Sequence, residues 1–169
     1  MRGYAVIGLD NPKRKANVGA VVRAAGCYGV DMVALAGCRM GSYRPDVNKA
    51  WHHMPVAEVS DLRLLTLYKC VPVAIDLVPG AQSLVTYTHP ERAFYVFGAE
   101  DATLDGDLLA WCHDVVYVPT RDCMNLAAAV NVVLYDRLAK RGGTAAQQRY
   151  EETRLWRTQR QEALSGSRT

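Results

Sequence analysis

Apolar and polar residues alternate in blocks along this chain, and most of the apolar blocks are bounded by glycine, proline or charged residues. Short apolar blocks with such borders are typical of buried strands. Five blocks predict strands, at Tyr4–Leu9, Met32–Ala36, Val71–Leu77, Phe94–Phe97 and Val115–Val118. Helical stretches separate several of these runs. Strands that alternate with helices predict an α/β fold with a mostly parallel sheet flanked by helices.

The helical stretches differ in the strength of their pattern. Apolar residues recur with helical spacing from Val18 to Ala25, and we expect Asn17 to cap the start of this helix. Shorter apolar patterns predict helices at Leu62–Tyr68 and Leu104–Trp111. Polar or proline-containing segments predict loops at Gly37–Val59 and Pro79–Arg92.

The last helical stretch, Met124–Leu138, has an unusual composition. From Met124 to Leu134 it is apolar nearly all round, with Asn125 and Asn131 as its only strongly polar residues. A helix that is apolar on every side must be covered on every side. In so small a domain the missing cover indicates a subunit interface, and we therefore expect a homodimer.

Length and composition narrow the class of protein. The chain has 169 residues, one domain's worth, with 50% hydrophobic and 22% charged residues. It has no apolar run long enough for a membrane span, and Met1–Asp10 lacks a signal-peptide layout, so we expect a cytoplasmic protein with no membrane partner. Five scattered cysteines indicate reduced thiols. The adjacent pairs Cys112–His113 and His52–His53 are weak metal candidates, and we predict no metal. We expect all four histidines, including His89, in loops or at the surface.

The positive charges are clustered, although the net charge is only +3. Lys13, Arg14 and Lys15 are consecutive, and a second group in the predicted loop around Arg44 is also basic. The segment after Ala139 is rich in arginine. Basic loops next to apolar strands favour contact with a phosphate backbone, and a solvated surface is the alternative.

Several common site motifs are absent from the sequence. There is no Gly-x-Gly-x-x-Gly after the first strand, no phosphate-binding loop, no Gly-x-Ser-x-Gly and no His-Glu-x-x-His. An α/β protein without these motifs needs another ligand site, which we expect at the loops after the carboxyl ends of the strands.

Three segments at such positions carry candidate chemistry. The first runs from Asn17 to Arg23 at a helix start, where an arginine and free amide groups suit a phosphate or an ionising hydroxyl. The second is Phe97-Gly98-Ala99-Glu100, where a strand runs into a glycine. The third is Val118-Pro119-Thr120 followed by Cys123-Met124-Asn125-Leu126, a loop that turns into the apolar helix.

In order and spacing these segments resemble the three motifs of the SpoU/TrmH branch of the SPOUT superfamily, RNA 2′-O-ribose methyltransferases. The resemblance covers roughly residues 4–136 and is to a minimal, single-domain member. It implies a deep C-terminal trefoil knot, S-adenosyl-L-methionine (AdoMet) as cofactor, and RNA as substrate, with tRNA favoured over rRNA. It also implies a catalytic domain at residues 1–140 and a basic C-terminal helix or tail at residues 141–169.

The resemblance implies roles for individual residues. Arg23 corresponds to the arginine that acts on the target 2′-hydroxyl, Asn17 to the residue that positions it, and Glu100 and Asn125 to the residues that shape the site. Cofactor-binding positions fall on Leu77, Gly98, Val118 and Met124. The RNA-binding candidates are Lys13, Arg14, Lys15 and Arg44.

Two departures from the motifs leave alternatives open. Cys123 stands where the family usually has serine, and Ala127 replaces another small polar residue. A thiol is a weak hydrogen-bond donor, so a contact in the third motif can be lost. A SPOUT enzyme that methylates a base, and an inactive domain that binds RNA or AdoMet, are the alternatives to the ribose methyltransferase.

Overall fold

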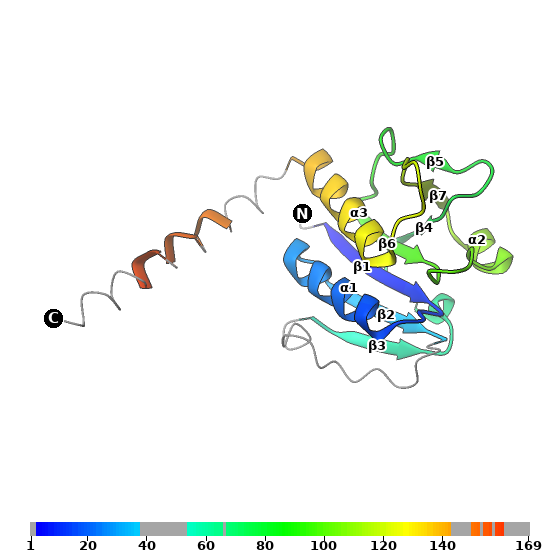
Figure 1. The fold of residues 1–169 in the computed structure, drawn as a ribbon, viewed down its shortest axis with the longest axis horizontal. Coiled ribbons are helices and arrows are strands. Elements are labelled where there is room, and N and C mark those ends of the chain that lie inside the picture. Colours follow the sequence, from blue (N-terminus) through cyan, green and yellow to red (C-terminus); the bar gives the residue numbers. More distant parts are fainter. Residues whose placement is uncertain are drawn as a thin grey trace.

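A seven-stranded sheet forms the centre of the computed structural model, and each of its pairings is parallel (Figure 1). The structure describes residues 3–37, 54–65, 67–142, 150–152, 154–156 and 158–160. The strands are β1 (Tyr4–Asp10), β2 (Met32–Ala36), β3 (Val56–Val59), β4 (Val71–Ile75), β5 (Gln82–Ser83), β6 (Arg92–Phe97) and β7 (Asp114–Tyr117). Their order in the sheet is β3-β2-β1-β6-β4-β7-β5. The predicted α/β fold with a mostly parallel sheet is confirmed.

Successive residues of a strand point to opposite sides of the sheet, and both faces of this sheet are covered. Ile7 and Leu9 of β1 belong to a core shared with helices α1 (Lys15–Tyr28) and α3 (Leu126–Lys140), which lie side by side on one face (Figure 1). Val6 of β1 packs on the other face, in a second core with the 3-10 helix Leu62–Leu64 and helix α2 (Gly106–Trp111). This layout leaves the carboxyl ends of the strands free to carry loops.

The five predicted strands are confirmed within one or two residues at each end, and the pattern missed two others. β3 lies inside the segment predicted as a loop, and β5 consists of two residues in the polar segment 79–92. The predicted helix Leu62–Tyr68 is wrong, because Leu62–Leu64 is the only helical part of this range among its described residues. Lys69, just after the range, adopts a left-handed backbone with φ 53°.

Helix α1 starts earlier than predicted, and Asn17 is not its cap. Arg14 is the N-cap residue, and its carbonyl oxygen accepts hydrogen bonds from the backbone amides of Asn17 and Val18 at 3.1 and 3.2 Å. Asn17 therefore lies within the first turn, where its side chain is free to bond to other parts of the chain. In contrast, Asn125 does cap α3, since its side chain accepts a hydrogen bond from the Ala127 amide at 2.9 Å.

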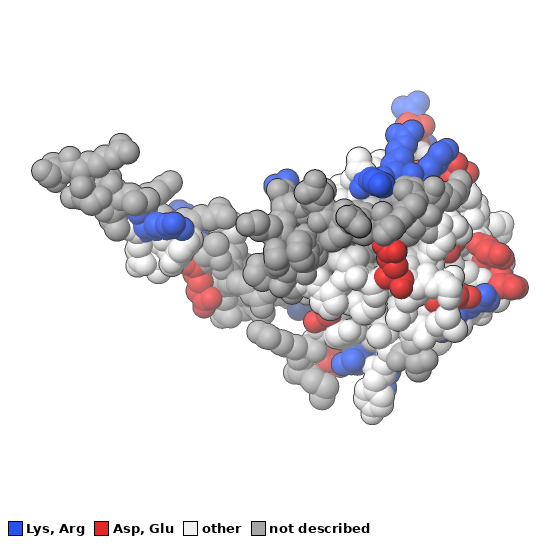
Figure 2. All heavy atoms as spheres, turned by 90° about the horizontal axis from the view of Figure 1, so that it is seen from below, with Lys and Arg blue, Asp and Glu red and all other residues white. Residues whose placement is uncertain are grey.

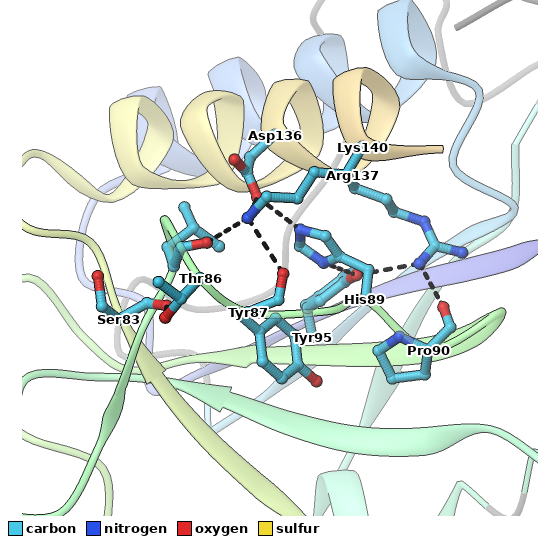
Figure 3. A network of polar contacts seen from close by, with 10 residues as sticks. Ser83, Thr86, Tyr87, His89, Pro90, Tyr95, Asp136, Arg137 and Lys140 are labelled. Carbon is cyan, nitrogen blue, oxygen red and sulfur yellow. Dashed lines mark hydrogen bonds and ion pairs between the residues drawn. The ribbon is translucent and has the colours of Figure 1, made fainter. Parts of the chain in front are cut away.

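The carboxyl end of α3 is joined to the sheet by a buried polar network (Figure 3). The side chain of Arg137 is 7% exposed and donates hydrogen bonds to the carbonyl oxygens of Pro90, Glu91 and Tyr4. His89 lies between the hydroxyl of Tyr95 and the carboxylate of Asp136, at 2.6 and 2.8 Å. His89 lies in a loop, as expected, but it is buried there, with 8% of the residue exposed.

The remaining expectations concern membrane spans, the cover of helix α3, the knot and the homodimer. Within the part of the chain that the structure describes, no helix is both long and apolar enough to cross a membrane. α3 buries one side only, and Val132 and Tyr135 on its outer side are 36% and 62% exposed. The C-terminal knot, the homodimer and the division at residue 140 stay predictions.

Candidate cofactor and catalytic site

A cavity of about 730 Å³ opens at the carboxyl ends of β4, β6 and β7. Its walls are the segment 75–77 after β4, the segment 97–103 after β6, the segment from Tyr117 to Met124 after β7, and two residues of α3. All four predicted cofactor-binding residues line it, and they come from three different loops. These residues are Leu77, Gly98, Val118 and Met124.

A chain of side-chain hydrogen bonds joins the three sequence motifs beside this cavity. The side-chain amide of Asn17 donates to Glu100, and its carbonyl oxygen accepts a hydrogen bond from the amide of Asn125 at 3.0 Å. Glu100 also accepts a hydrogen bond from the Lys13 backbone amide at 3.2 Å. Asn17 therefore joins Glu100 and Asn125, which lie 83 and 108 positions after it in the sequence.

The electrostatics around Glu100 favour its ionised form. Burial by itself would raise the pKa of this carboxyl, but hydrogen bonds from Asn17 and Lys13 and the charge of Arg14 hold the pKa below its ordinary value. The ammonium group of Lys13 forms an ion pair with the neighbouring Asp101 at 2.9 Å. The segment after β6 is thus fastened to the start of α1 by a carboxylate that stays charged at neutral pH.

Comparison with known proteins gives matches that include the same three segments. The family model described as the SpoU rRNA Methylase family matches residues 4–135, which includes every motif residue described above. The chain belongs to the SpoU rRNA methylase family. A relative described as an uncharacterized tRNA/rRNA methyltransferase of Archaeoglobus fulgidus is 29% identical over 144 residues. That alignment covers 79% of this chain and 63% of the relative, so the chain spans less than two thirds of that protein's length.

Three solved structures share the fold of this chain. The SpoU methyltransferase AviRb from Streptomyces viridochromogenes, in complex with the cofactor AdoMet, is 20% identical with a TM-score of 0.72, over 83% of this chain and 59% of that one. The A. aeolicus TrmH/SpoU tRNA modifying enzyme is 16% identical with a TM-score of 0.74, over 86% and 79%. A structure described for 2-OH methylation of C/U34 on tRNA is 23% identical with a TM-score of 0.68, over 85% and 99%.

In this SpoU-family chain, the surroundings of two residues of the cavity wall, Gly98 and Cys123, bear on how the cavity is built. A Cβ atom on Gly98 would lie 3.2 Å from the Ala102 carbonyl oxygen and 3.3 Å from a methyl carbon of Leu104. A side chain at this position would therefore crowd the loop, and its neighbours would have to shift by a few tenths of an ångström. Cys123 is an exposed free thiol in the wall, at the position where the motif usually has serine.

Arg23 lies apart from the other candidate catalytic residues. It is exposed on α1, six residues after Asn17, or roughly 9 Å further along the helix axis. It does not line the cavity of its own subunit, and no hydrogen bond joins it to Asn17 among the described residues. The expected reach of Arg23 back to the helix start stays a prediction, and α1 begins at Lys15, eight residues before it.

The RNA-binding candidates lie around the start of α1 where they are described. Lys13, Arg14 and Lys15 are exposed there, next to the segment that carries Glu100. Arg44 lies outside the described residues. Lys13 is engaged by Asp101, so part of its charge is already used within the subunit.

Sequence reasoning missed one acidic residue of the cavity wall, Asp76, directly after β4. One of its carboxylate oxygens accepts a hydrogen bond from the Leu77 amide at 2.7 Å, and the other accepts one from the Leu104 amide at 2.8 Å. A single acidic residue after a strand has no signal in the sequence pattern. Its partner Leu104 is 28 positions away.

Metal ligation has no support among the described side chains, which include no group of three histidine, cysteine or acidic residues able to hold an ion. His113 and Asp114 form an exposed pair, while Cys112 is buried. Burial raises the pKa of the Cys112 thiol to about 12, which keeps it protonated. His52 and His53 lie outside the described residues.

Proposed function

We propose that this chain is an AdoMet-dependent RNA methyltransferase that transfers a methyl group to a ribose 2′-hydroxyl of tRNA or rRNA. The observation that carries the proposal is the single cavity at the strand ends, beside which Asn17, Glu100 and Asn125 are joined by hydrogen bonds. Membership of the SpoU family supports a methyl-transfer reaction. The bound AdoMet in one solved relative, and the ribose methylation named for another, support the cofactor and the target atom.

The cavity suits AdoMet in size and in chemistry. Its volume of about 730 Å³ lies within the range of small-molecule sites. Leu77, Val118 and Met124 offer apolar surface, while Asp76 and Glu100 offer negative charge to a cationic ligand. Bound there, AdoMet would supply an electrophilic methyl group on a sulfonium. The protein then has to align a weak oxygen nucleophile and ease the loss of its proton.

We assign the catalytic roles to Arg23, Asn17, Glu100 and Asn125. Arg23 stabilises the negative charge that develops on the 2′-oxygen, because a guanidinium stays protonated and is a poor base. A neighbouring RNA phosphate takes the hydroxyl proton. Asn17, Glu100 and Asn125 fix the helix start against the loops of the cavity, and they act through the hydrogen bonds that join them.

The position of Arg23 supports a homodimer in which the site is shared. The exposed side of α1 carries Ala16, Ala20, Arg23 and Cys27, and the exposed side of the neighbouring α3 carries Ala128, Asn131, Val132 and Tyr135. Contiguous exposed apolar side chains and small residues of this kind mark association surfaces. We infer that two subunits meet through this joint face and that Arg23 of one subunit completes the cavity of the other.

The RNA partner is supported by charge. Figure 2 shows lysine and arginine side chains gathered at one end of the face in view, with acidic side chains along the neighbouring edge. Lys13, Arg14, Lys15 and Arg44 are our candidates for contact with the phosphate backbone, which basic side chains bind without reading sequence. We favour tRNA over rRNA because the relative described for methylation of tRNA is matched over 99% of its length. A cytoplasmic location, and a catalytic domain at residues 1–140 with a basic tail at residues 141–169, belong to the same proposal.

The test is methyl transfer from labelled AdoMet to bulk tRNA and bulk rRNA, followed by nucleoside analysis. A labelled 2′-O-methyl nucleoside supports the proposal, and its appearance in tRNA alone supports the favoured substrate. A labelled base favours the alternative of a base methyltransferase. Binding of AdoMet without transfer favours an inactive binding domain.

A mixing experiment tests the shared site. Arg23→Ala and Gly98→Val subunits are each expected to be inactive alone, since one lacks the arginine and the other has a crowded cavity loop. If Arg23 acts on the partner's cavity, a mixed dimer contains one site with both substitutions and one intact site. If Arg23 acts within its own subunit, each site of the mixed dimer carries one substitution. Recovery of transfer on mixing supports the shared site. Absence of recovery in verified mixed dimers means that Arg23 acts within its own subunit.

A further inference from the structure

Asp76 holds together two walls of the cavity. Its backbone amide continues the pairing of β4 with β7 through a hydrogen bond to the Val116 carbonyl oxygen at 3.0 Å. Its carboxylate accepts one hydrogen bond from the Leu77 amide and one from the Leu104 amide, at 2.7 and 2.8 Å. The segment after β4 and the segment that leads into α2 are therefore fixed by the same side chain.

The partners of Asp76 differ from those of Glu100 and Asp101, two other carboxylates in the wall. Glu100 is hydrogen bonded to Asn17 and to the Lys13 amide, and Asp101 is ion-paired with Lys13. Among the described residues, the hydrogen-bond donors to Asp76 are neutral backbone amides, and no ion pair joins it to a lysine or arginine. Arg121 also lines the cavity, and no ion pair joins it to Asp76 among the described residues.

Methyl transfer changes the charge of the ligand in such a cavity. The methyl group passes from sulfur to the ribose oxygen, the hydroxyl proton leaves, and the cationic sulfonium of AdoMet becomes the neutral thioether of S-adenosylhomocysteine. The two ligands share their adenosine and amino acid parts. A carboxylate in the cavity wall therefore distinguishes them by charge, because it attracts the sulfonium of AdoMet, which the product lacks.

We propose that Asp76 is a specificity-determining residue that makes the cavity favour the charged methyl donor over its neutral product, and thereby helps the product to leave. This inference rests on the proposed function, since it takes AdoMet as the ligand. The same carboxylate keeps the two loop amides in place, so charge and position come from one residue. Removing the negative charge of Asp76 from this half-exposed site is expected to change the affinity for AdoMet by roughly tenfold.

The experiment measures the affinities of AdoMet and S-adenosylhomocysteine by calorimetry, without RNA, for the wild type and Asp76→Asn. The asparagine keeps the size of the side chain and one oxygen acceptor. We expect AdoMet binding to weaken by roughly tenfold and S-adenosylhomocysteine binding by less than about twofold. Asp107→Asn removes the same charge from an exposed position on α2 outside the cavity, and it serves as the matched control. It should leave the ratio of the two affinities as in the wild type.

Equal losses for both ligands in Asp76→Asn would overturn the inference and leave Asp76 a purely structural link between the loops. Unchanged affinities would overturn it as well. If circular dichroism shows that Asp76→Asn does not fold, the wild type is titrated at rising salt, where AdoMet binding must weaken more than product binding. A wild type that binds neither ligand contradicts the proposed function itself, and this result is distinct from a failure of the charge argument.

Discussion

Replacing Arg137 with methionine should destabilise the domain far more than the same change at Arg141. Arg137 donates hydrogen bonds to the Pro90 carbonyl oxygen at 2.6 Å and the Tyr95 hydroxyl at 3.1 Å (Figure 3). It also donates to the carbonyl oxygens of Glu91 and Tyr4 at 2.8 and 3.3 Å. Its guanidinium also lies 5.7 Å from the centre of the Tyr95 ring. These contacts attach the end of α3 to the starts of β1 and β6.

The expected magnitude follows from the two short bonds. A hydrogen bond made by a charged group contributes roughly 1.5–3 kcal/mol net. The Glu91 carbonyl oxygen keeps a hydrogen bond from the Tyr4 amide, and the longer bonds of Arg137 are weaker, so the bonds lost sum to about 4 kcal/mol. Methionine fills most of the volume and removes the cost of burying a charge, which offsets about 1 kcal/mol. We expect Arg137→Met to lower the free energy of unfolding by about 3 kcal/mol.

Urea denaturation followed by circular dichroism measures this change, at one protein concentration because association adds to apparent stability. Arg141 donates to the Pro90 and Glu91 carbonyl oxygens at 3.4 and 2.9 Å but is exposed, so Arg141→Met should cost less than about 1 kcal/mol. Equal, small losses for the two variants would refute the conclusion that the buried network holds α3 to the sheet.

Three further predictions concern single side chains. Burial lowers the pKa of His89 despite its bond to Asp136, so the unfolded chain takes up a proton more readily than the folded chain. The free energy of unfolding should therefore fall as the pH drops below the ordinary histidine pKa of about 6.5. His89→Gln should flatten this decline in a pH series of urea titrations. Asn17→Ala should slow single-turnover methyl transfer at least about tenfold and raise the pKa of Glu100 toward its ordinary value, measured by NMR titration, whereas Asn131→Ala on the outer side of α3 should leave that pKa unchanged. Cys123→Ser should tighten AdoMet binding roughly fivefold in calorimetry, since a hydroxyl donates a stronger hydrogen bond than a thiol, and an unchanged affinity would show that this position makes no bond to the ligand.

The central strands could be located from the sequence because parallel strands buried on both faces consist of apolar residues throughout. β1 and β6 show this most clearly, with Val6, Ile7, Tyr95 and Val96 fully buried. β3 and β5 lie at the edges of the sheet, where burial is partial and polar residues are tolerated. Glu58 in β3 breaks the apolar pattern, so that strand could not be recognised.

The candidate site shows the same division between local and distant causes. The three motif segments could be found because each carries a recognisable local sequence at a strand end or helix start. The sequence pattern favours a cap at Asn17 because capping is a local preference, while its actual partners are 83 and 108 positions away. Asp76 and His89 depend on partners 28 and 47 positions away, and tertiary contacts of that kind have no periodic signal in the sequence.

Alkaline hydrolysis directly distinguishes a methyl group on a ribose oxygen of RNA from one on a base. Alkali cleaves RNA through the free 2′-hydroxyl, so a methylated ribose protects the bond that follows it. RNA methylated with labelled AdoMet by this protein should release its label in alkali-resistant dinucleotides. Release of the label in mononucleotides would place the methyl group on a base and contradict the account.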